Sequence, residues 1–187
     1  MMNIQAIEQI LSDSKKMYVG MKKYKSIMDT LHWTDVSADR DFQRTFNGFF
    51  VMRSKKKEYY DMFYSFLEQK KNKGVSFEET LEHLKEAGGQ LEISFSSKLI
   101  HIINPNRPIW DNNVAVQHFG MKMPNYGMDI VVRQKEAVRV YHEYCSRFYE
   151  YLDSSDGQSA LRMFNDKYPH TGFTDAKKID FLMWVDV

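Results

Sequence analysis

The stretch SFSSKLIHIINPNRPIWDNNV, residues 94–114, contains the pattern from which the fold of this chain is inferred. Up to Asn104 its apolar residues recur three and four positions apart, which is the spacing of one helix face. Pro105 and Pro108 then interrupt the pattern, because proline removes a backbone hydrogen bond from a helix interior. Asp111 follows at a position where its side chain can cap a new helix. The stretch therefore predicts two helices joined by a rigid loop that delivers Asp111 to a helix start.

The same helical spacing recurs along most of the chain, and alternating β-branched segments are scarce, so we predict an all-α protein. Ser76 and Glu79 form a capping box ahead of a helix that Gly88 and Gly89 end. Further helices are expected over residues 3–12, 16–31, 38–50, 57–71, 129–152, 156–166 and 175–185. Two of these ranges, 57–71 and 129–152, contain an apolar stripe that we expect to face the core, namely Tyr59, Phe63, Phe66 and Leu67 in the first, and Ala137, Val140, Tyr141, Tyr144, Phe148 and Leu152 in the second. The chain has no internal repeat, low-complexity run or linker, so we expect one domain over residues 1–187.

Length and composition limit the possible functions. The chain has 187 residues, and its 26 Lys and Arg against 25 Asp and Glu give a net charge of +1. The molecule as a whole is therefore not a polycation, and any nucleic-acid contact must be a local patch. Cys145 has no second cysteine to pair with, and the six histidines lack metal-ligand spacing, so we expect neither a metal nor another cofactor.

The cellular location is inferred from the absence of targeting patterns. No apolar run approaches the roughly 20 residues that cross a bilayer, and the N-terminus lacks the basic-then-apolar order of a signal peptide. We therefore expect a cytoplasmic monomer that makes no membrane contact.

Two motifs carry a resemblance to a known family. LKEAGGQLEISFSSKLIHII, residues 84–103, resembles the hairpin of the helix-hairpin-helix DNA glycosylases, and RPIWDNNV, residues 107–114, resembles the loop that holds their obligatory aspartate. This likeness covers about residues 78–118. Together with FNGFFVMR and DAKKIDFLMW, the same motifs are similar to a family of small bacterial proteins distantly related to those glycosylases. The resemblance implies a helical DNA glycosylase-like domain with a helix-hairpin-helix-like element, and double-stranded DNA as the partner.

The resemblance also implies roles for two residues. Asp111 corresponds to the essential carboxylate, which stabilises the positive charge that develops on the sugar and orients the attacking water. Lys98 is the candidate for the lysine that forms a Schiff base in lyase-active members. It precedes Asp111 by 111 − 98 = 13 residues, fewer than the resemblance implies, and the lysine position falls on Ser96 if Ser97 takes the small-residue position. We therefore expect monofunctional hydrolysis. Local sequence alone favours a plain helix cap for Asp111 and a solvated helix lysine for Lys98.

The hairpin departs from the family pattern in its glycines. A glycosylase hairpin has a Gly-apolar-Gly turn that holds a DNA phosphate, whereas Gly88 and Gly89 here are adjacent. Phosphate binding at this turn is therefore not expected to follow the family pattern.

Four further residues near this loop are candidates for substrate binding: Ser97, His101, Trp110 and Asn112. A base-processing enzyme needs planar side chains around an extruded base, and Trp110 is adjacent to Asp111. His101 lies one turn after Lys98 on the same helix face. The alternative for His101 is a packed histidine. The alternative for the aromatic residues is core packing, and it applies to Trp110, Trp33, Tyr126 and Trp184.

The stretch RSKKKEYY places four basic residues at a predicted helix start, namely Arg53, Lys55, Lys56 and Lys57. Positive charge there opposes the helix macrodipole, so helix stability does not explain it. Contact with the DNA phosphate backbone would explain the positive charge at this helix start. The alternative is a solvated charged surface. Lys177 and Lys178, near the start of the last helix, suggest the same contact more weakly.

These observations predict a metal-free DNA N-glycosylase that extrudes a base and leaves an abasic site. The base is either a damaged purine or a hypermodified base from phage DNA, in which case the enzyme serves antiviral defence. We favour the phage base because a free-standing minimal domain with an unusual hairpin looks divergent from housekeeping repair. The alternative is a non-catalytic DNA- or protein-binding module that retains the glycosylase fold.

Overall fold

The computed structural model describes residues 2, 4–12, 14–53, 55–88, 90–125 and 127–187. The predicted all-α class is confirmed, because the described residues form helices and no strand. The helices are α1 (Ile4–Ser12), α2 (Ser14–Leu31), α3 (Arg40–Phe50), α4 (Lys57–Lys70), α5 (Phe77–Gly88), α6 (Ile93–Ile103), α7 (Asn112–Phe119), α8 (Ile130–Asp153), α9 (Ser155–Lys167) and α10 (Asp175–Asp186). Each expected range agrees with its helix to within two residues at either end. Gly89, part of the predicted helix stop, lies outside the described residues.

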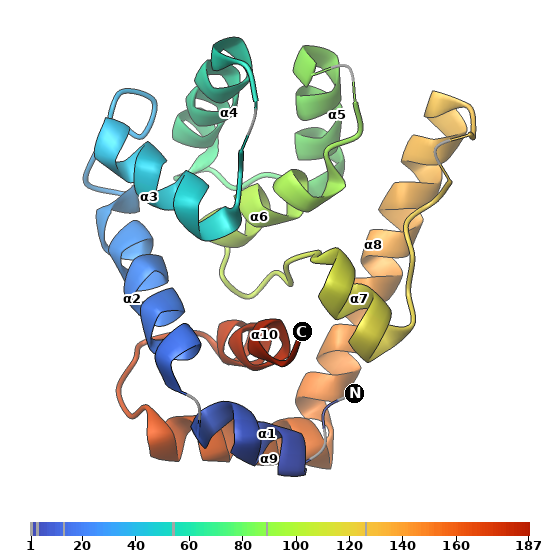
Figure 1. Ribbon diagram of the computed structural model, residues 1–187. Helices are drawn as coiled ribbons and strands as arrows, with labels where there is room; N and C mark the ends of the chain where they lie inside the picture. Colours follow the sequence, from blue (N-terminus) through green and yellow to red (C-terminus); the bar gives the residue numbers. More distant parts are fainter. Residues whose placement is uncertain (1, 3, 13, 54, 89, 126) are drawn as a thin grey trace. The chain divides into compact units, whose positions relative to one another are not determined.

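The chain divides into two compact units, which are drawn together in Figure 1. Unit 1 comprises Met1–Met17 and Pro105–Val187, and unit 2 comprises Tyr18–Asn104. Unit 1 therefore contains both ends of the chain, and unit 2 is one continuous segment. One boundary falls where the Pro-bounded loop begins, which is the point at which α6 must end. The single domain expected from the sequence stays a prediction.

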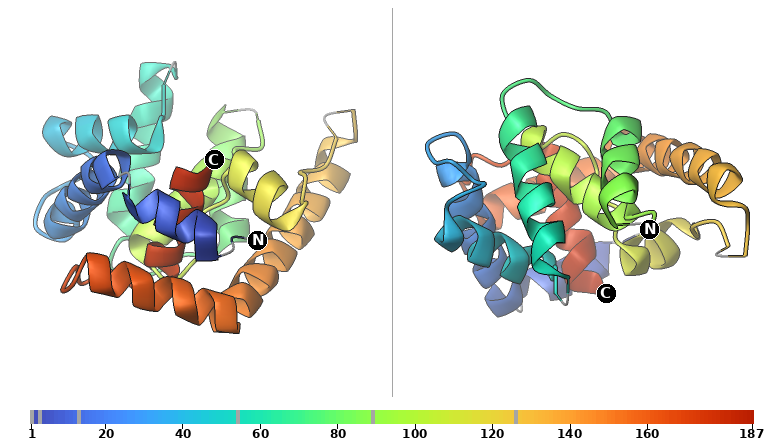
Figure 2. Two further views of the ribbon diagram at one scale, coloured as in Figure 1. Left: turned by 60° about the horizontal axis from the view of Figure 1, so that its bottom comes forward. Right: turned by 90° about the horizontal axis from the view of Figure 1, so that it is seen from above.

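Unit 1 is built around α10, which packs against α1, α7, α8 and α9. Figures 1 and 2 both show α1 beside α9 and α10. The aromatic stripe of α8 fills the interior, with Tyr141, Tyr144 and Phe148 fully buried. This confirms the predicted buried face of α8 except at Leu152, which is half-buried. Burying such large side chains is the main stabilising term for the unit.

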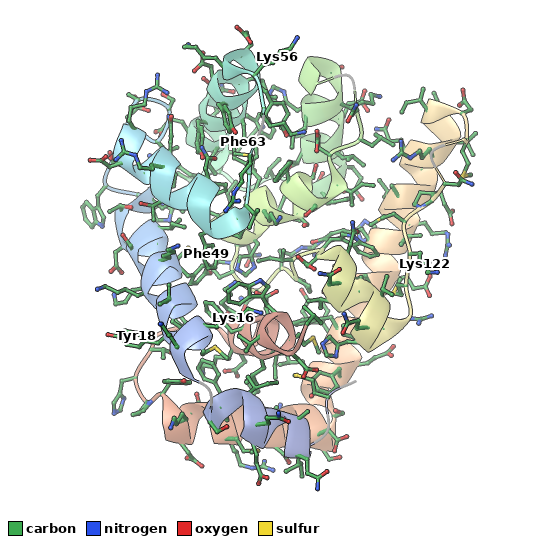
Figure 3. The ribbon with its side chains drawn as sticks, in the orientation of Figure 1. Lys16, Tyr18, Phe49, Lys56, Phe63 and Lys122 are labelled. Carbon is green, nitrogen blue, oxygen red and sulfur yellow. The ribbon has the colours of Figure 1, made fainter. Side chains whose placement is uncertain are left out.

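Unit 2 packs α4 against α5 and α5 against α6, as the view from above in Figure 2 shows. Its centre is an aromatic cluster in which the Phe46 ring lies 4.6 Å from the ring of Phe50 and 5.6 Å from that of Phe63, measured between centroids. Figure 3 shows Phe63 directed into this unit, whereas Lys56 lies at the outer end of α4. The predicted stripe of α4 is confirmed, since Tyr59, Phe63 and Leu67 are buried.

The helix caps follow local sequence. Asp39, Asp129, Ser154 and Thr174 each accept a backbone hydrogen bond at the start of the helix that follows them. The Ser76 hydroxyl accepts the Glu79 amide at 3.0 Å, which is one half of the predicted capping box. The Glu79 carboxylate lies 2.5 Å from Lys70 Nζ.

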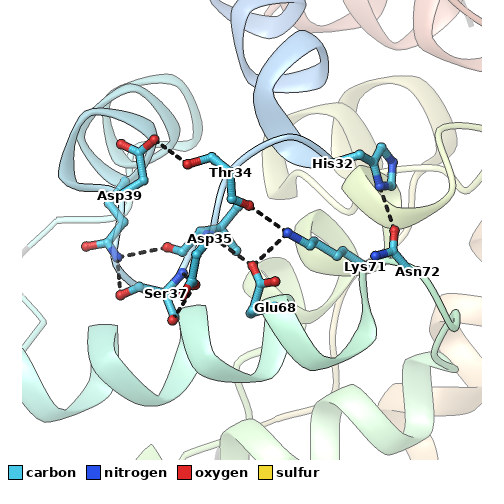
Figure 4. Close-up of polar contacts among 10 residues, drawn as sticks. His32, Thr34, Asp35, Ser37, Asp39, Glu68, Lys71 and Asn72 are labelled. Atoms are coloured by element: carbon cyan, nitrogen blue, oxygen red, sulfur yellow. Dashed lines mark hydrogen bonds and ion pairs between the residues drawn. The ribbon is translucent and has the colours of Figure 1, made fainter.

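The turn between α2 and α3 is held by buried and half-buried polar contacts (Figure 4). Lys71 Nζ donates to the carbonyl oxygen of Thr34 at 2.7 Å and lies 2.8 Å from the Glu68 carboxylate. Glu68 accepts the Val36 amide at 2.8 Å. This network fixes the position from which α3 begins. Trp33 stands in the same turn with 90% of its surface exposed, so the core-packing interpretation of this residue is wrong.

Candidate active site

The loop of residues 105–111, here called the Asp111 loop, is held by four hydroxyl groups of unit 1. Each hydroxyl donates to a backbone carbonyl of the loop: Thr174 to Pro105 at 2.8 Å, Tyr149 to Asn106 at 3.0 Å, Tyr141 to Pro108 at 2.9 Å and Tyr144 to Ile109 at 3.0 Å. A buried carbonyl without a hydrogen bond is costly, so the bonds to Pro108 and Ile109, which are buried, stabilise the irregular backbone. The two prolines and the four hydroxyls together give the loop one conformation.

Asp111 caps α7, as its position in the sequence predicts. Its Oδ1 accepts the backbone amides of Asn113 at 2.9 Å and Val114 at 3.3 Å. Its Oδ2 makes no hydrogen bond within the described residues, and the side chain is half-buried. One carboxylate oxygen is therefore structural and the other is available to a ligand, so the cap and the catalytic interpretation do not exclude each other.

Trp110 lies in the core of unit 1, with 1% of its surface exposed. Its indole Nε1 donates to Asn112 Oδ1 at 2.7 Å, and its ring packs edge-on against Tyr144 with centroids 5.0 Å apart. Core packing is the interpretation that this geometry supports. A base cannot stack on Trp110 in this conformation, and Asn112 is occupied in orienting the indole.

Behind the loop lies a cluster of buried polar groups around Tyr144. Burial raises the pKa of Tyr144 well above its ordinary value, and electrostatic interactions with Asp180, Cys145 and Asp111 raise it further. The Tyr144 hydroxyl therefore stays protonated and remains a hydrogen-bond donor to Ile109. The Asp111 carboxylate acts on the same cluster from the loop side.

Lys177 belongs to this core, with 2% of its surface exposed. Its Nζ lies 2.6 Å from Asp180 Oδ2 and 4.3 Å from the centre of the Phe181 ring. Burial lowers the pKa of Lys177, and Asp180 opposes that shift. The phosphate contact suggested for Lys177 is therefore wrong, because its charge is buried and paired. Lys178 pairs with Asp175 at 2.8 Å.

The hairpin candidates Ser97, Lys98 and His101 lie on α6 in unit 2. Lys98 Nζ donates to the carbonyl oxygen of Phe50 at 3.2 Å and stands 5.1 Å from the centre of the Phe95 ring. Ser97 is buried and donates to the Ser94 carbonyl at 2.8 Å. Lys98 belongs to unit 2, whereas Asp111 belongs to unit 1.

His101 is a packed histidine, with 1% of its surface exposed and its Nε2 3.1 Å from the Tyr24 hydroxyl. Its ring also contacts the Tyr24 ring, with centroids 5.7 Å apart. The environment of His101 therefore agrees with a packed histidine and not with direct contact with a substrate.

The basic stretch before α4 is only partly as predicted. The helix begins at Lys57, so Arg53 and Lys55 precede it. Lys55 pairs with Glu92 and lies over the Tyr59 ring, and Lys57 pairs with Asp61. Arg53 and Lys56 are exposed and form no ion pair with the described part of the chain. These two are the residues of the stretch whose charge is fully available.

A groove of about 620 Å³ between α3 and α4 was not predicted from the sequence. Its lining residues are Arg40, Gln43, Arg44, Asn47, Lys55, Lys57, Tyr60 and Asp61. The available signal was the repetition of Arg at 40 and 44 and of Gln and Asn at 43 and 47, since positions four apart share a helix face. We define these eight residues as the α3–α4 groove.

Two searches for other kinds of site and the comparisons with known proteins give no positive result. Across the described ranges, no three His, Cys, Asp or Glu side chains are grouped to hold a metal ion. In the same part of the chain, no helix has both the length and the apolar character needed to cross a membrane. Comparison with protein-family models, with curated proteins and with solved structures finds no match. Any function must therefore be argued from the site.

Proposed function

We propose that this protein is a DNA N-glycosylase that hydrolyses the bond between deoxyribose and a modified base and leaves an abasic site. The observation that supports this most directly is the state of Asp111. Two backbone amides at the start of α7 hold Oδ1, and Oδ2 is left without a hydrogen bond among the described residues. The resemblance of α5, α6 and the Asp111 loop to the helix-hairpin-helix glycosylases points to the same reaction.

In the proposed reaction, cleavage of the N-glycosidic bond builds positive charge on the sugar. The Asp111 carboxylate stabilises that charge, and its Oδ2 orients or deprotonates the attacking water. Such stabilisation works best when the charged group is already fixed before the reaction, because no energy is then spent on reorganisation. The hydroxyls of Tyr141 and Tyr144, through Pro108 and Ile109, provide that fixation.

Hydrolysis is preferred over a lyase reaction because of the contacts of Lys98. Its Nζ is already a donor to the Phe50 carbonyl and lies against the Phe95 ring. A Schiff base requires a free amine that reaches the sugar, so Lys98 would have to leave both contacts. We therefore propose that the abasic site is the product and that the strand is not nicked efficiently.

The substrate class is tested with a panel of DNAs. Purified protein is incubated with DNA carrying oxidised or alkylated purines and with phage genomes that carry hypermodified bases, and abasic sites are then labelled with an aldehyde-reactive probe. Labelling of one class supports the proposal and identifies the base. If every DNA in the panel remains unlabelled although the protein binds it, the glycosylase proposal fails. The α3–α4 groove then favours the alternative, a DNA-binding module without catalysis.

A further inference from the structure

The α3–α4 groove combines four basic side chains with one acidic side chain on a single face of unit 2. Arg40 and Arg44 come from α3, Lys57 and Asp61 from α4, and Lys55 from the segment between the helices. The groove is thus positively charged although the whole protein is nearly neutral. Such a local excess of positive charge favours an anionic ligand.

The positively charged side chain of Arg40 is oriented by a neutral neighbour, Gln43. Its Nη1 donates to Gln43 Oε1 at 2.7 Å, and it has no acidic partner among the described residues. Gln43 has only 6% of its surface exposed, and its Nε2 donates to the carbonyls of Val36 at 2.9 Å and Ser37 at 3.0 Å. These two bonds point Oε1 toward Arg40. A buried neutral amide therefore orients a guanidinium without neutralising it.

Helix stability does not explain this arrangement. Arg40 is the first residue of α3 and Lys57 is the first residue of α4, where positive charge opposes the macrodipole. The ion pairs of Arg44 and Lys57 are also weak because they are exposed, whereas Lys55 forms a half-buried pair with Glu92. Arg44 pairs with Asp41 at 2.7 Å, but both side chains are largely exposed, and such pairs contribute little in water. An anionic ligand can displace them at small cost.

The neutral residues of the groove add donors beside the cations. The Tyr64 hydroxyl donates to Asn47 Oδ1 at 2.7 Å, and within the described ranges the two amide N–H groups of Asn47 make no hydrogen bond, so they can bind an acceptor. Arg40 uses one of its five N–H donors on Gln43 and keeps four. Several oriented donors around positive charge are what a phosphate diester requires, since its oxygens accept hydrogen bonds as well as attract charge.

We propose that the α3–α4 groove binds consecutive phosphate groups of a duplex DNA backbone, an inference that rests on the proposed function for the choice of DNA. Its cations come from α3, from α4 and from the segment between them, whereas a site for one small anion gathers its donors around a point. Arg53 and Lys56 are near Lys55 and Lys57 in sequence and are exposed.

The test measures affinity for a short fluorescent duplex of unmodified DNA by anisotropy at several salt concentrations. The variant is Arg40→Gln with Arg44→Gln, made in the full chain. The matched control is Arg162→Gln on α9 in unit 1, because Arg162 also donates to a neutral side chain, the Ser159 hydroxyl at 2.8 Å. Thermal midpoints of all variants check folding. Arg40→Lys separates charge from geometry, since lysine keeps the charge but loses the oriented fork.

The wild type and the control are expected to bind alike. The double variant should bind more weakly and lose about two units from the slope of log affinity against log salt, at roughly 0.9 per phosphate contact. Arg40→Lys should keep the slope and lose part of the affinity. A double variant with the slope and affinity of the control would overturn the proposal. So would a wild type that ignores duplex DNA but is stabilised by inorganic phosphate.

Base release is assayed in parallel, so that the two proposals fail separately. Groove-dependent binding without base release from any DNA upholds the groove and rejects the glycosylase. If base is released but DNA affinity does not change when Arg40 and Arg44 are substituted, the groove proposal is rejected and the glycosylase proposal is supported.

Discussion

The hydroxyl of Tyr144 on α8 lies 3.0 Å from the carbonyl oxygen of Ile109, two residues before Asp111. Both residues are buried, so this bond fixes the backbone that carries the carboxylate. Tyr144→Phe should destabilise unit 1 by about 1–3 kcal/mol, because it leaves a buried carbonyl unpaired. Tyr149→Phe is the control, since Tyr149 is only partly buried and water can replace its bond to Asn106.

The effect of each substitution on activity is measured as the rate of base release. Its effect on stability is measured by chemical denaturation. Tyr144→Phe should lower the rate more than Tyr149→Phe does, because Asp111 then samples unproductive positions. Equal stability and equal rates for the two variants would show that these hydroxyls do not position the loop.

Asp111→Asn should abolish base release and leave the thermal midpoint nearly unchanged. Asparagine caps helices as well as aspartate does but lacks the negative charge. The control is Asp129→Asn, because Asp129 caps α8 with nearly the same geometry, accepting the amides of Val131 at 2.9 Å and Val132 at 3.2 Å. This control should keep full activity. An active Asp111→Asn protein would remove Asp111 from the mechanism.

Borohydride treatment during the reaction should not attach the protein covalently to DNA. Lys98 is engaged with the Phe50 carbonyl, and a hydrolytic enzyme forms no Schiff base to be reduced. The measurement is a mobility shift on a denaturing gel, with Lys98→Ala run beside the wild type. Efficient trapping that disappears in Lys98→Ala would restore Lys98 as the nucleophile.

The buried pair of Lys177 and Asp180 should behave as one energetic unit. Lys177→Met alone should cost about 3–5 kcal/mol of unfolding free energy, because it removes the cation that lies 2.6 Å from the buried Asp180 carboxylate. Lys177→Met combined with Asp180→Leu should be more stable than Lys177→Met. Chemical denaturation of the two single variants and the double variant measures the coupling. Additive effects would mean that the two charges do not stabilise each other.

Two glycine substitutions should have opposite effects on stability. A Cβ at Gly157 would lie 2.0 Å from the carbonyl oxygen of Tyr151, so Gly157→Ala should destabilise unit 1 by about 2–3 kcal/mol or prevent folding. A Cβ at Gly48, within α3, meets no atom within 4 Å. Gly48→Ala should therefore stabilise unit 2 by about 0.5–1 kcal/mol. Thermal denaturation compares both with the wild type, and a stable Gly157→Ala protein would contradict the close packing of α8 and α9.

Helices and caps were predictable because their hydrogen bonds join residues a few positions apart. Asp111 and Asp129 each bind amides two and three residues ahead, so their role follows from the local sequence. The period of apolar residues likewise indicates which face of α8 is buried before any partner helix is known. The all-α class, the helix ranges and the cap at the candidate site were all obtained in this way.

Only the tertiary structure decided the environment of the remaining residues, because it depends on which faces pack together. The hydroxyls that hold the Asp111 loop come from residues 33 to 69 positions away. Lys177 and Trp33 looked ordinary in sequence, as a surface lysine and a core tryptophan, and packing reversed both. The orientation of Arg40 by a buried Gln43 likewise depends on a folded turn. Local periodicity determines that a helix forms, whereas the burial and pairing of each side chain depend on neighbours that only folding brings near.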